Sequence, residues 1–144
     1  MKTIKIAYWL LTVIIAFMMT YAAYMYLTND QVKQAFVHMG FPAYFRIELA
    51  VAKFIGAVTL LLPVTGRVKE WTYTGFAIIF VSAFIAHISS GDPAAVYLMP
   101  LISLVLLVGS YLGYQNLQVS GQKVERHTEL SKTRQERLLH QHSN

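Results

Sequence analysis

Apolar residues along the chain fall into four long runs, at about residues 6–27, 43–63, 71–90 and 94–114. An α-helix rises about 1.5 Å per residue, so about 20 residues cross the ~30 Å hydrocarbon core of a bilayer. Each run therefore has the length of a transmembrane helix. The connections between consecutive runs are short, which favours antiparallel neighbours. The pattern predicts an all-α fold, namely a four-transmembrane-helix antiparallel bundle.

The first run has a competing interpretation as a secretory signal peptide. Lys2 and Lys5 precede it, and the small residues Ala22 and Ala23 lie near its end. The apolar core of a signal peptide spans roughly 7–15 residues, whereas this run continues past twenty. We therefore predict a retained transmembrane helix.

A short amphipathic helix is predicted between the first two runs. Asn29 and Asp30 are N-cap candidates, and Val32, Phe36 and Met39 follow one another at i, i+4 and i+7. This spacing places the three apolar side chains on one helical face. The segment is too short to cross a bilayer, so we expect it on the outer surface or over the mouth of the bundle.

The chain changes character after Tyr114. Residues 115–144 are polar and carry both signs of charge, whereas residues 1–114 contain all four apolar runs. Short-range ion pairs support only a weak, solvated helix in such a segment. We predict a membrane domain over residues 1–114 and a mobile, polar cytoplasmic tail over residues 115–144.

The composition supports a membrane protein and removes several kinds of chemistry. Charged residues make up 13% of the 144 residues, against about 25% in soluble domains. The chain has no cysteine, which excludes disulfides, dithiol relays, iron–sulfur clusters and thiolate zinc sites. No catalytic motif is visible, so the sequence leaves open whether the chain is an enzyme.

Positive charge is concentrated before the first run, between the second and third runs, and after the fourth run. The cations are Lys2, Lys5, Arg67, Lys69, Lys123, Arg126, Lys132, Arg134 and Arg137. In an antiparallel bundle these segments share one side, and the positive-inside rule makes that side cytoplasmic, with both termini. Aromatic residues are not interleaved with these cations, so nucleic acid is not expected as a partner.

The second run carries charges inside an apolar span. Arg46, Glu48 and Lys53 lie within residues 42–63, although a charge at the bilayer centre costs about 2.5–3.5 kcal/mol. His87 lies near the end of the third run, at the depth of Arg46 if neighbouring spans are antiparallel. We predict that these four residues form one interior, ligand-binding polar site that opens toward the extracytoplasmic side.

Each of these residues has a structural alternative. Arg46 could instead extend its side chain to lipid headgroups, and Glu48 could form an ion pair with Arg46 or His87. Lys53 could pair with Glu48 or be neutral with a lowered pKa. His87 could be a histidine at the membrane interface whose hydrogen bonds are already made. A Schiff-base role for Lys53 is the weaker interpretation, because no aldehyde pocket is recognised. One histidine and one carboxylate do not complete a metal site, so none is predicted.

Four short segments and one histidine follow one another along the apolar region: MGFP at 39–42, KFIGA at 53–57, LLP at 61–63, KEW at 69–71, and His87. In this order and spacing the chain resembles the DoxX-like family of the DoxX/DoxD superfamily over residues 6–114. The resemblance implies a four-helix integral protein of the bacterial inner membrane. The superfamily includes subunits linked to thiosulfate:quinone oxidoreduction and to complexes of oxidative-stress defence. A glutamate commonly occupies the position of Lys53 in the DoxX branch proper, so the charge is reversed here.

Two classes of function are therefore predicted. The first is a small-molecule-binding module or accessory subunit whose polar site holds a quinone, a lipid or an organic anion. The alternative is a membrane component of an oxidoreductase system that passes electrons to quinone with a redox partner protein. No cofactor is visible in the sequence, although quinone is a candidate. A transporter is a weaker interpretation, because four helices without repeats make a small pore. The sequence leaves the oligomeric state open.

Overall fold

The structure is a computed structural model that describes residues 2–64 and 66–142, with side chains described as far as Leu138. Every regular element in these ranges is an α-helix. The helices are α1 (Lys2–Thr28), α2 (Asp30–His38), α3 (Ala43–Leu61), α4 (Arg67–Ser89) and α5 (Ala94–His142). The prediction of an all-α fold is confirmed.

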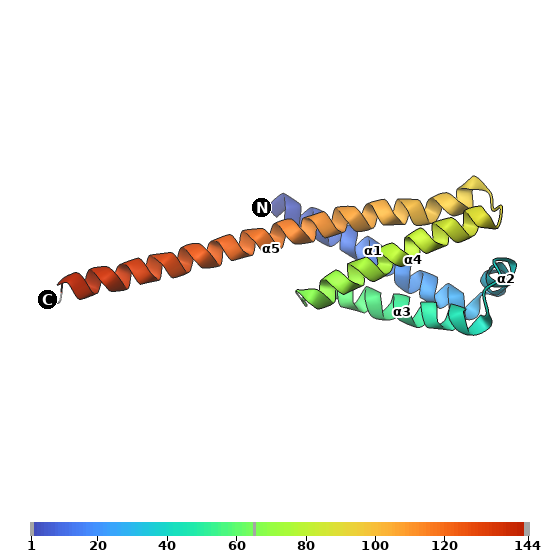
Figure 1. Ribbon diagram of the computed structural model, residues 1–144, viewed down its shortest axis with the longest axis horizontal. Helices are drawn as coiled ribbons and strands as arrows, with labels where there is room; N and C mark the ends of the chain where they lie inside the picture. The colour runs from blue at the N-terminus through green and yellow to red at the C-terminus, as the bar shows by residue number, and fades with distance from the viewer. Residues whose placement is uncertain (1, 65, 143–144) are drawn as a thin grey trace.

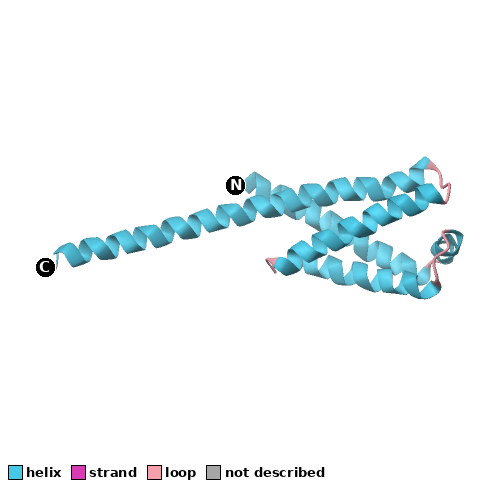
Figure 2. Cartoon of the chain, viewed as in Figure 1, coloured by secondary structure: helices cyan, strands magenta, loops and turns pink. Residues whose placement is uncertain are grey.

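The four long helices alternate in direction (Figure 1). The N-terminus, the α3–α4 turn and the C-terminal half of α5 lie toward one end of the molecule, which we call the turn end. Helix α2 and the α4–α5 connection lie at the other end, the α2 end. Helix α1 packs against α3 and α5, α4 packs against α5, and the contact between α3 and α4 is smaller. Only short loops join the helices (Figure 2).

The interior contains apolar side chains from all four long helices, including Ile15, Leu60, Phe80 and Leu107. Helices α3 and α4 approach each other most closely toward the turn end. A Cβ atom added to Gly56 would overlap the ring of Phe76, so a larger residue at this crossing would have to displace that buried ring. Toward the α2 end, α3 and α4 diverge (Figure 1).

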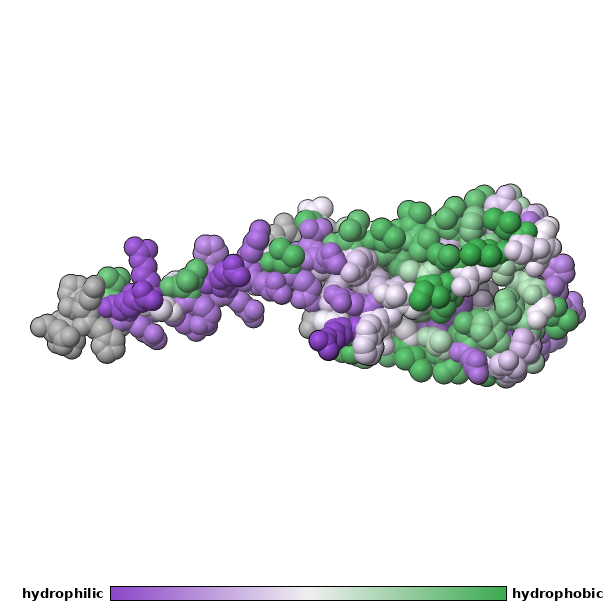
Figure 3. All heavy atoms as spheres, in the orientation of Figure 1, coloured by the Kyte–Doolittle hydropathy of each residue, from purple (hydrophilic) through white to green (hydrophobic). Residues whose placement is uncertain are grey.

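On the face drawn in Figure 3 the bundle is mostly apolar with some polar residues, whereas the projecting half of α5 is mostly polar; many large hydrophobic side chains of the bundle are exposed. Helices α1, α4 and α5 are each long and apolar enough to cross a membrane. Within the described residues α3 is not in this set, because its 19 residues include Arg46, Glu48 and Lys53. The predicted spans therefore correspond to three strongly apolar helices and one charged helix that runs beside them.

The short amphipathic helix is confirmed as α2. The side chain of Asn29 caps it by accepting hydrogen bonds from the main-chain N–H groups of Gln31 at 2.9 Å and Val32 at 3.1 Å. Phe36 is buried, as its place on the apolar face predicts. Gly40 follows the end of α2 with a φ of 78°, a backbone conformation that costs glycine little.

Helix α5 is longer than the predicted fourth span. It runs without a break from Ala94 to His142, so Tyr114 is not the end of a helix and the predicted tail is helical. Tyr114 is buried and Leu117 still packs on the core. The side chains from 121 to 138 are exposed, which agrees with a solvated segment that has no packed face.

Candidate functional site

A pocket of about 290 Å³ lies between α3 and α4 at the α2 end, where the two helices diverge. We call it the α2 pocket. It is lined by Tyr26, Phe36, Met39, Phe41, Phe45, Leu49, Ile78, Ile79, Ser82, Ala83, Ala86 and His87. Helix α2 contributes Phe36 to its wall, so the amphipathic helix lies against the pocket.

Aromatic rings form one wall of the α2 pocket. Tyr26 of α1 and Phe36 of α2 meet edge to face with ring centroids 4.9 Å apart. The series continues from Phe36 to Phe41 at 6.0 Å and from Phe41 to Phe45 at 5.0 Å. Such contacts stabilise a packed surface beyond the burial of apolar area. The wall therefore suits a flat, apolar ligand.

Lys53 is buried, with 5% of its surface exposed. Its Nζ donates a hydrogen bond of 3.0 Å to the hydroxyl of Tyr26. The same nitrogen lies 4.3 Å from the centroid of the Tyr26 ring, within the range of a cation–π interaction. Lys53 therefore reaches the α2 pocket through Tyr26.

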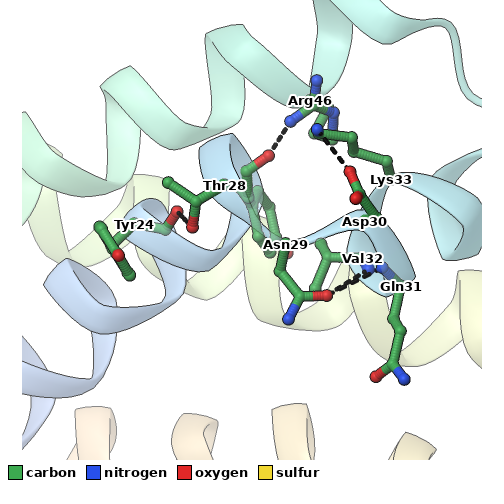
Figure 4. Close-up of polar contacts among 9 residues, drawn as sticks. Tyr24, Thr28, Asn29, Asp30, Gln31, Val32, Lys33 and Arg46 are labelled. Atoms are coloured by element: carbon green, nitrogen blue, oxygen red, sulfur yellow. Dashed lines mark hydrogen bonds and ion pairs between the residues drawn. The ribbon is translucent and has the colours of Figure 1, made fainter.

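Arg46 contacts the same residue at its main chain. Its guanidinium donates to the carbonyl oxygen of Tyr26 in the last turn of α1, and Figure 4 shows Arg46 of α3 directed at this corner. Carbonyls in a last helical turn have no intrahelical partner, and the helix macrodipole favours a cation there. Arg46 therefore caps α1, a role that the sequence prediction did not include.

His87 lies on the opposite side of the α2 pocket. Its Nδ1 is 2.6 Å from Oδ2 of Asp92, and Nε2 of His38 is 3.5 Å from the other oxygen of that carboxylate. Asp92 in the α4–α5 connection thus joins α4 to the end of α2. The carboxylate fixes the orientation of the His87 ring.

The four predicted site residues do not form one cluster. Arg46 and Lys53 meet at Tyr26, and His87 faces the same pocket from α4. Glu48 is exposed and makes no ion pair or hydrogen bond among the described residues. It lies about 160° around the helix from Arg46, because two residues turn an α-helix by about 200°. The carboxylate expected beside Lys53 therefore faces outward.

Lys69, which the sequence analysis counted only among the cations of the cytoplasmic side, is buried. Only 2% of it is exposed. Its Nζ donates to the carbonyl oxygens of Leu60 at 2.6 Å and Leu62 at 3.0 Å, with that of Thr59 at 3.5 Å. Lys69 therefore caps the C-terminus of α3 from the first turn of α4. The sequence contained one sign of this contact: the last turn of α3 has no basic residue of its own to bind its carbonyls.

A buried hydroxyl network crosses the interior. The hydroxyl of Ser110 lies 2.8 Å from that of Thr12 and 2.8 Å from that of Tyr73. Thr12 and Ser110 are both 0% exposed. The network ties α1, α4 and α5 together, and nothing in the sequence distinguished these hydroxyls from others in apolar runs.

An all-helical chain with three helices long and apolar enough to cross a membrane, and with lysines and hydroxyl groups buried between its helices, is an integral membrane protein. Among the described residues, no three His, Asp or Glu side chains come together as a metal site would need. The DoxX-like family model matches residues 10–110, so this chain belongs to the DoxX-like family, as its sequence segments predicted. No curated protein matches the chain, and neither does any solved structure.

Proposed function

We propose that the protein spans the bacterial inner membrane four times, with both termini in the cytoplasm. Helix α3 is 19 residues long and packs beside α1 and α4, as a fourth span would. Its Lys53 is turned inward, which avoids presenting an amine to lipid. The cation-rich segments lie toward the turn end (Figure 1), and the positive-inside rule then gives the orientation.

Within this bundle, we propose that the α2 pocket binds the ring of a quinone as a small-molecule-binding or accessory subunit. The observation that carries this proposal is the aromatic pocket of about 290 Å³ with the Lys53–Tyr26 pair on one side and His87 on the other. Ligand pockets usually measure about 300–1,000 Å³, so this one suits a single ring. A chain attached to the ring would leave between the diverging α3 and α4 into lipid.

The hydrogen-bonding groups of the pocket match the two opposite oxygens of a quinone or quinol. Because Tyr26 accepts a hydrogen bond from Lys53, its own hydroxyl proton is free for a ligand carbonyl. A carboxylate only accepts hydrogen bonds, so Nδ1 of His87 donates to Asp92, and Nε2 of the neutral ring is left to accept from a hydroxyl group of the quinol form. The carboxylate of Asp92 disfavours an organic anion at that side, and the aromatic wall favours a ring over an acyl chain.

The test is retention of a short-chain alkylated benzoquinone by detergent-purified protein, measured by native mass spectrometry over a concentration series. Ala83→Phe places a ring inside the α2 pocket and should weaken binding about tenfold or more, the equivalent of ~1.4 kcal/mol. Ala52→Phe is the matched control, because Ala52 is exposed on α3 and does not line the pocket.

Lys53→Met provides a second measurement if Ala83→Phe does not fold. It keeps the length of the side chain but removes the donor to Tyr26, so quinone binding should weaken while Ala52→Phe binds as the unaltered protein does. Binding that is equal in all variants, or no saturable quinone binding at all, would reject the proposal. Retention of phospholipid in place of quinone, lost in Ala83→Phe, would assign the pocket to lipid.

A further inference from the structure

A second pocket, of about 380 Å³, lies at the turn end, away from the α2 pocket. We call it the turn pocket. Tyr8 and Trp9 of α1 form one wall, the α3–α4 turn forms another, and α5 forms the third from Tyr114 to Glu125. The continuation of α5 beyond the predicted fourth span therefore has a structural consequence, because it supplies a wall of this pocket.

The base of the turn pocket is positively charged. Lys69 lines it and is almost fully buried. Its hydrogen bonds go to main-chain carbonyls, and among the described residues no carboxylate forms an ion pair with it. The C-terminus of α3 offsets only part of this charge, since a helix end carries about half an elementary charge. The pocket therefore attracts an anionic group.

Tyr114 offers a hydrogen-bond donor beside Lys69. Its hydroxyl oxygen accepts from the main-chain N–H of Gly66 at 3.0 Å and from Nε2 of Gln118 at 3.1 Å. Both contacts use the oxygen as acceptor, so the phenol proton remains for an acceptor in the pocket.

The outer part of the turn pocket carries the opposite charge. Glu125 lines it and is exposed on α5. Helical side chains tilt toward the N-terminus of their helix, so the carboxylate of Glu125 leans back along α5 toward Gln122, Gln118 and Tyr114. The pocket thus presents a cation and a phenol at its base and an anion at its rim.

We propose that the turn pocket binds the headgroup of a zwitterionic phospholipid with a primary ammonium group, of the phosphatidylethanolamine type. The phosphate lies toward Lys69 and Tyr114, and the ammonium lies toward Glu125. Trp9 lines the same pocket, and tryptophan is enriched at the level of lipid headgroups, so this end of the bundle lies where such a headgroup is available. The proposal concerns a different site from the quinone pocket and does not depend on it.

The test is native mass spectrometry of the full chain after incubation with an equimolar mixture of phosphatidylethanolamine, phosphatidylglycerol and phosphatidylcholine. The unaltered protein should retain phosphatidylethanolamine over each of the other two by about threefold or more, a ratio within reach of one exposed ion pair. Glu125→Gln should remove the preference over phosphatidylglycerol while leaving phospholipid bound. Glu129→Gln, on the exposed part of α5 outside the pocket, should leave the preference unchanged.

Tyr114→Phe should lower the retention of all three lipids, because it removes the donor to the phosphate. Glu125 is exposed, so Glu125→Gln tests the proposal even if Tyr114→Phe does not fold. Equal retention of the three lipids by the unaltered protein, or the same preference in Glu125→Gln and Glu129→Gln, would overturn the proposal. Ala83 lines the α2 pocket and not the turn pocket, so Ala83→Phe should leave the lipid preference intact. The result for lipid binding is therefore independent of whether quinone binding succeeds or fails.

Discussion

Replacement of Lys69 by methionine should destabilise the protein substantially although Lys69 lies in the first turn of its helix. Methionine has a similar length and an apolar side chain, so the substitution removes the donor without opening a large cavity. The carbonyl oxygens of Leu60 and Leu62, now 2.6 and 3.0 Å from Nζ, would lose this partner. Helix α3 has ended at this point, so no following turn supplies N–H groups to them.

The expected loss follows from three terms of different sign. A hydrogen bond to a charged group contributes about 1.5–3 kcal/mol, although hydrogen bonds inside membrane proteins average only ~0.6 kcal/mol. Removing a buried ammonium also removes its desolvation penalty, which opposes the loss. Two short bonds at a buried helix end outweigh that gain, because the stranded carbonyls each cost about 1–3 kcal/mol. We expect a net loss of about 2–4 kcal/mol.

The measurement is the free energy of unfolding in bicelles, obtained from an SDS titration followed by far-UV circular dichroism. Arg67→Met is the matched control, since Arg67 lies two residues earlier and is exposed; its effect should stay within about 0.5 kcal/mol. If Lys69→Met were as stable as Arg67→Met, the three carbonyl contacts would not hold the end of α3, and the capping role would be refuted.

Two further predictions concern the interior and the orientation of the bundle. Ser110→Ala removes the hydroxyl between Thr12 and Tyr73 and should cost about 1–2 kcal/mol of unfolding free energy; a loss equal to that of an exposed Ser131→Ala control would contradict the network. Reporter fusions after residues 40, 67, 92 and 130 should report outside, inside, outside and inside, and an outside signal at 130 would reverse the proposed orientation.

The helices could be predicted because apolar period and length are local properties of the sequence. The face of α2 is an example: spacing alone placed Val32, Phe36 and Met39 together, and Phe36 is buried as expected. The continuation of α5 had a local signal as well. Residues 122–142 contain no glycine or proline and are rich in glutamine, glutamate, lysine, arginine and leucine, which favour helix. Polarity predicted exposure correctly but did not predict the end of the helix.

The partners of the cations could not be predicted in the same way. A sequence shows which side chains carry negative charge, so Glu48 was predicted to share a site with Lys53, and an ion pair between them was one of the alternatives. Arg46 and Lys69 instead bind main-chain carbonyls, and every residue supplies such an oxygen. Which carbonyls lack a partner depends on where a neighbouring helix ends and how close it lies. The divergence of α3 from α4, which makes room for the α2 pocket, is likewise a property of packing.

Lys53 differs from Arg46 and Lys69 in its partner, because it binds the phenol of Tyr26 and not a main-chain carbonyl. This partner decides whether Tyr26 can donate a hydrogen bond into the α2 pocket. An ammonium donates to the Tyr26 oxygen and leaves the phenol proton for a ligand. A carboxylate at the same position would accept that proton and lie against the negative face of the ring. The ammonium group of Lys53 therefore leaves the Tyr26 hydroxyl as a donor to the α2 pocket, which is what the proposed binding of a quinone oxygen requires.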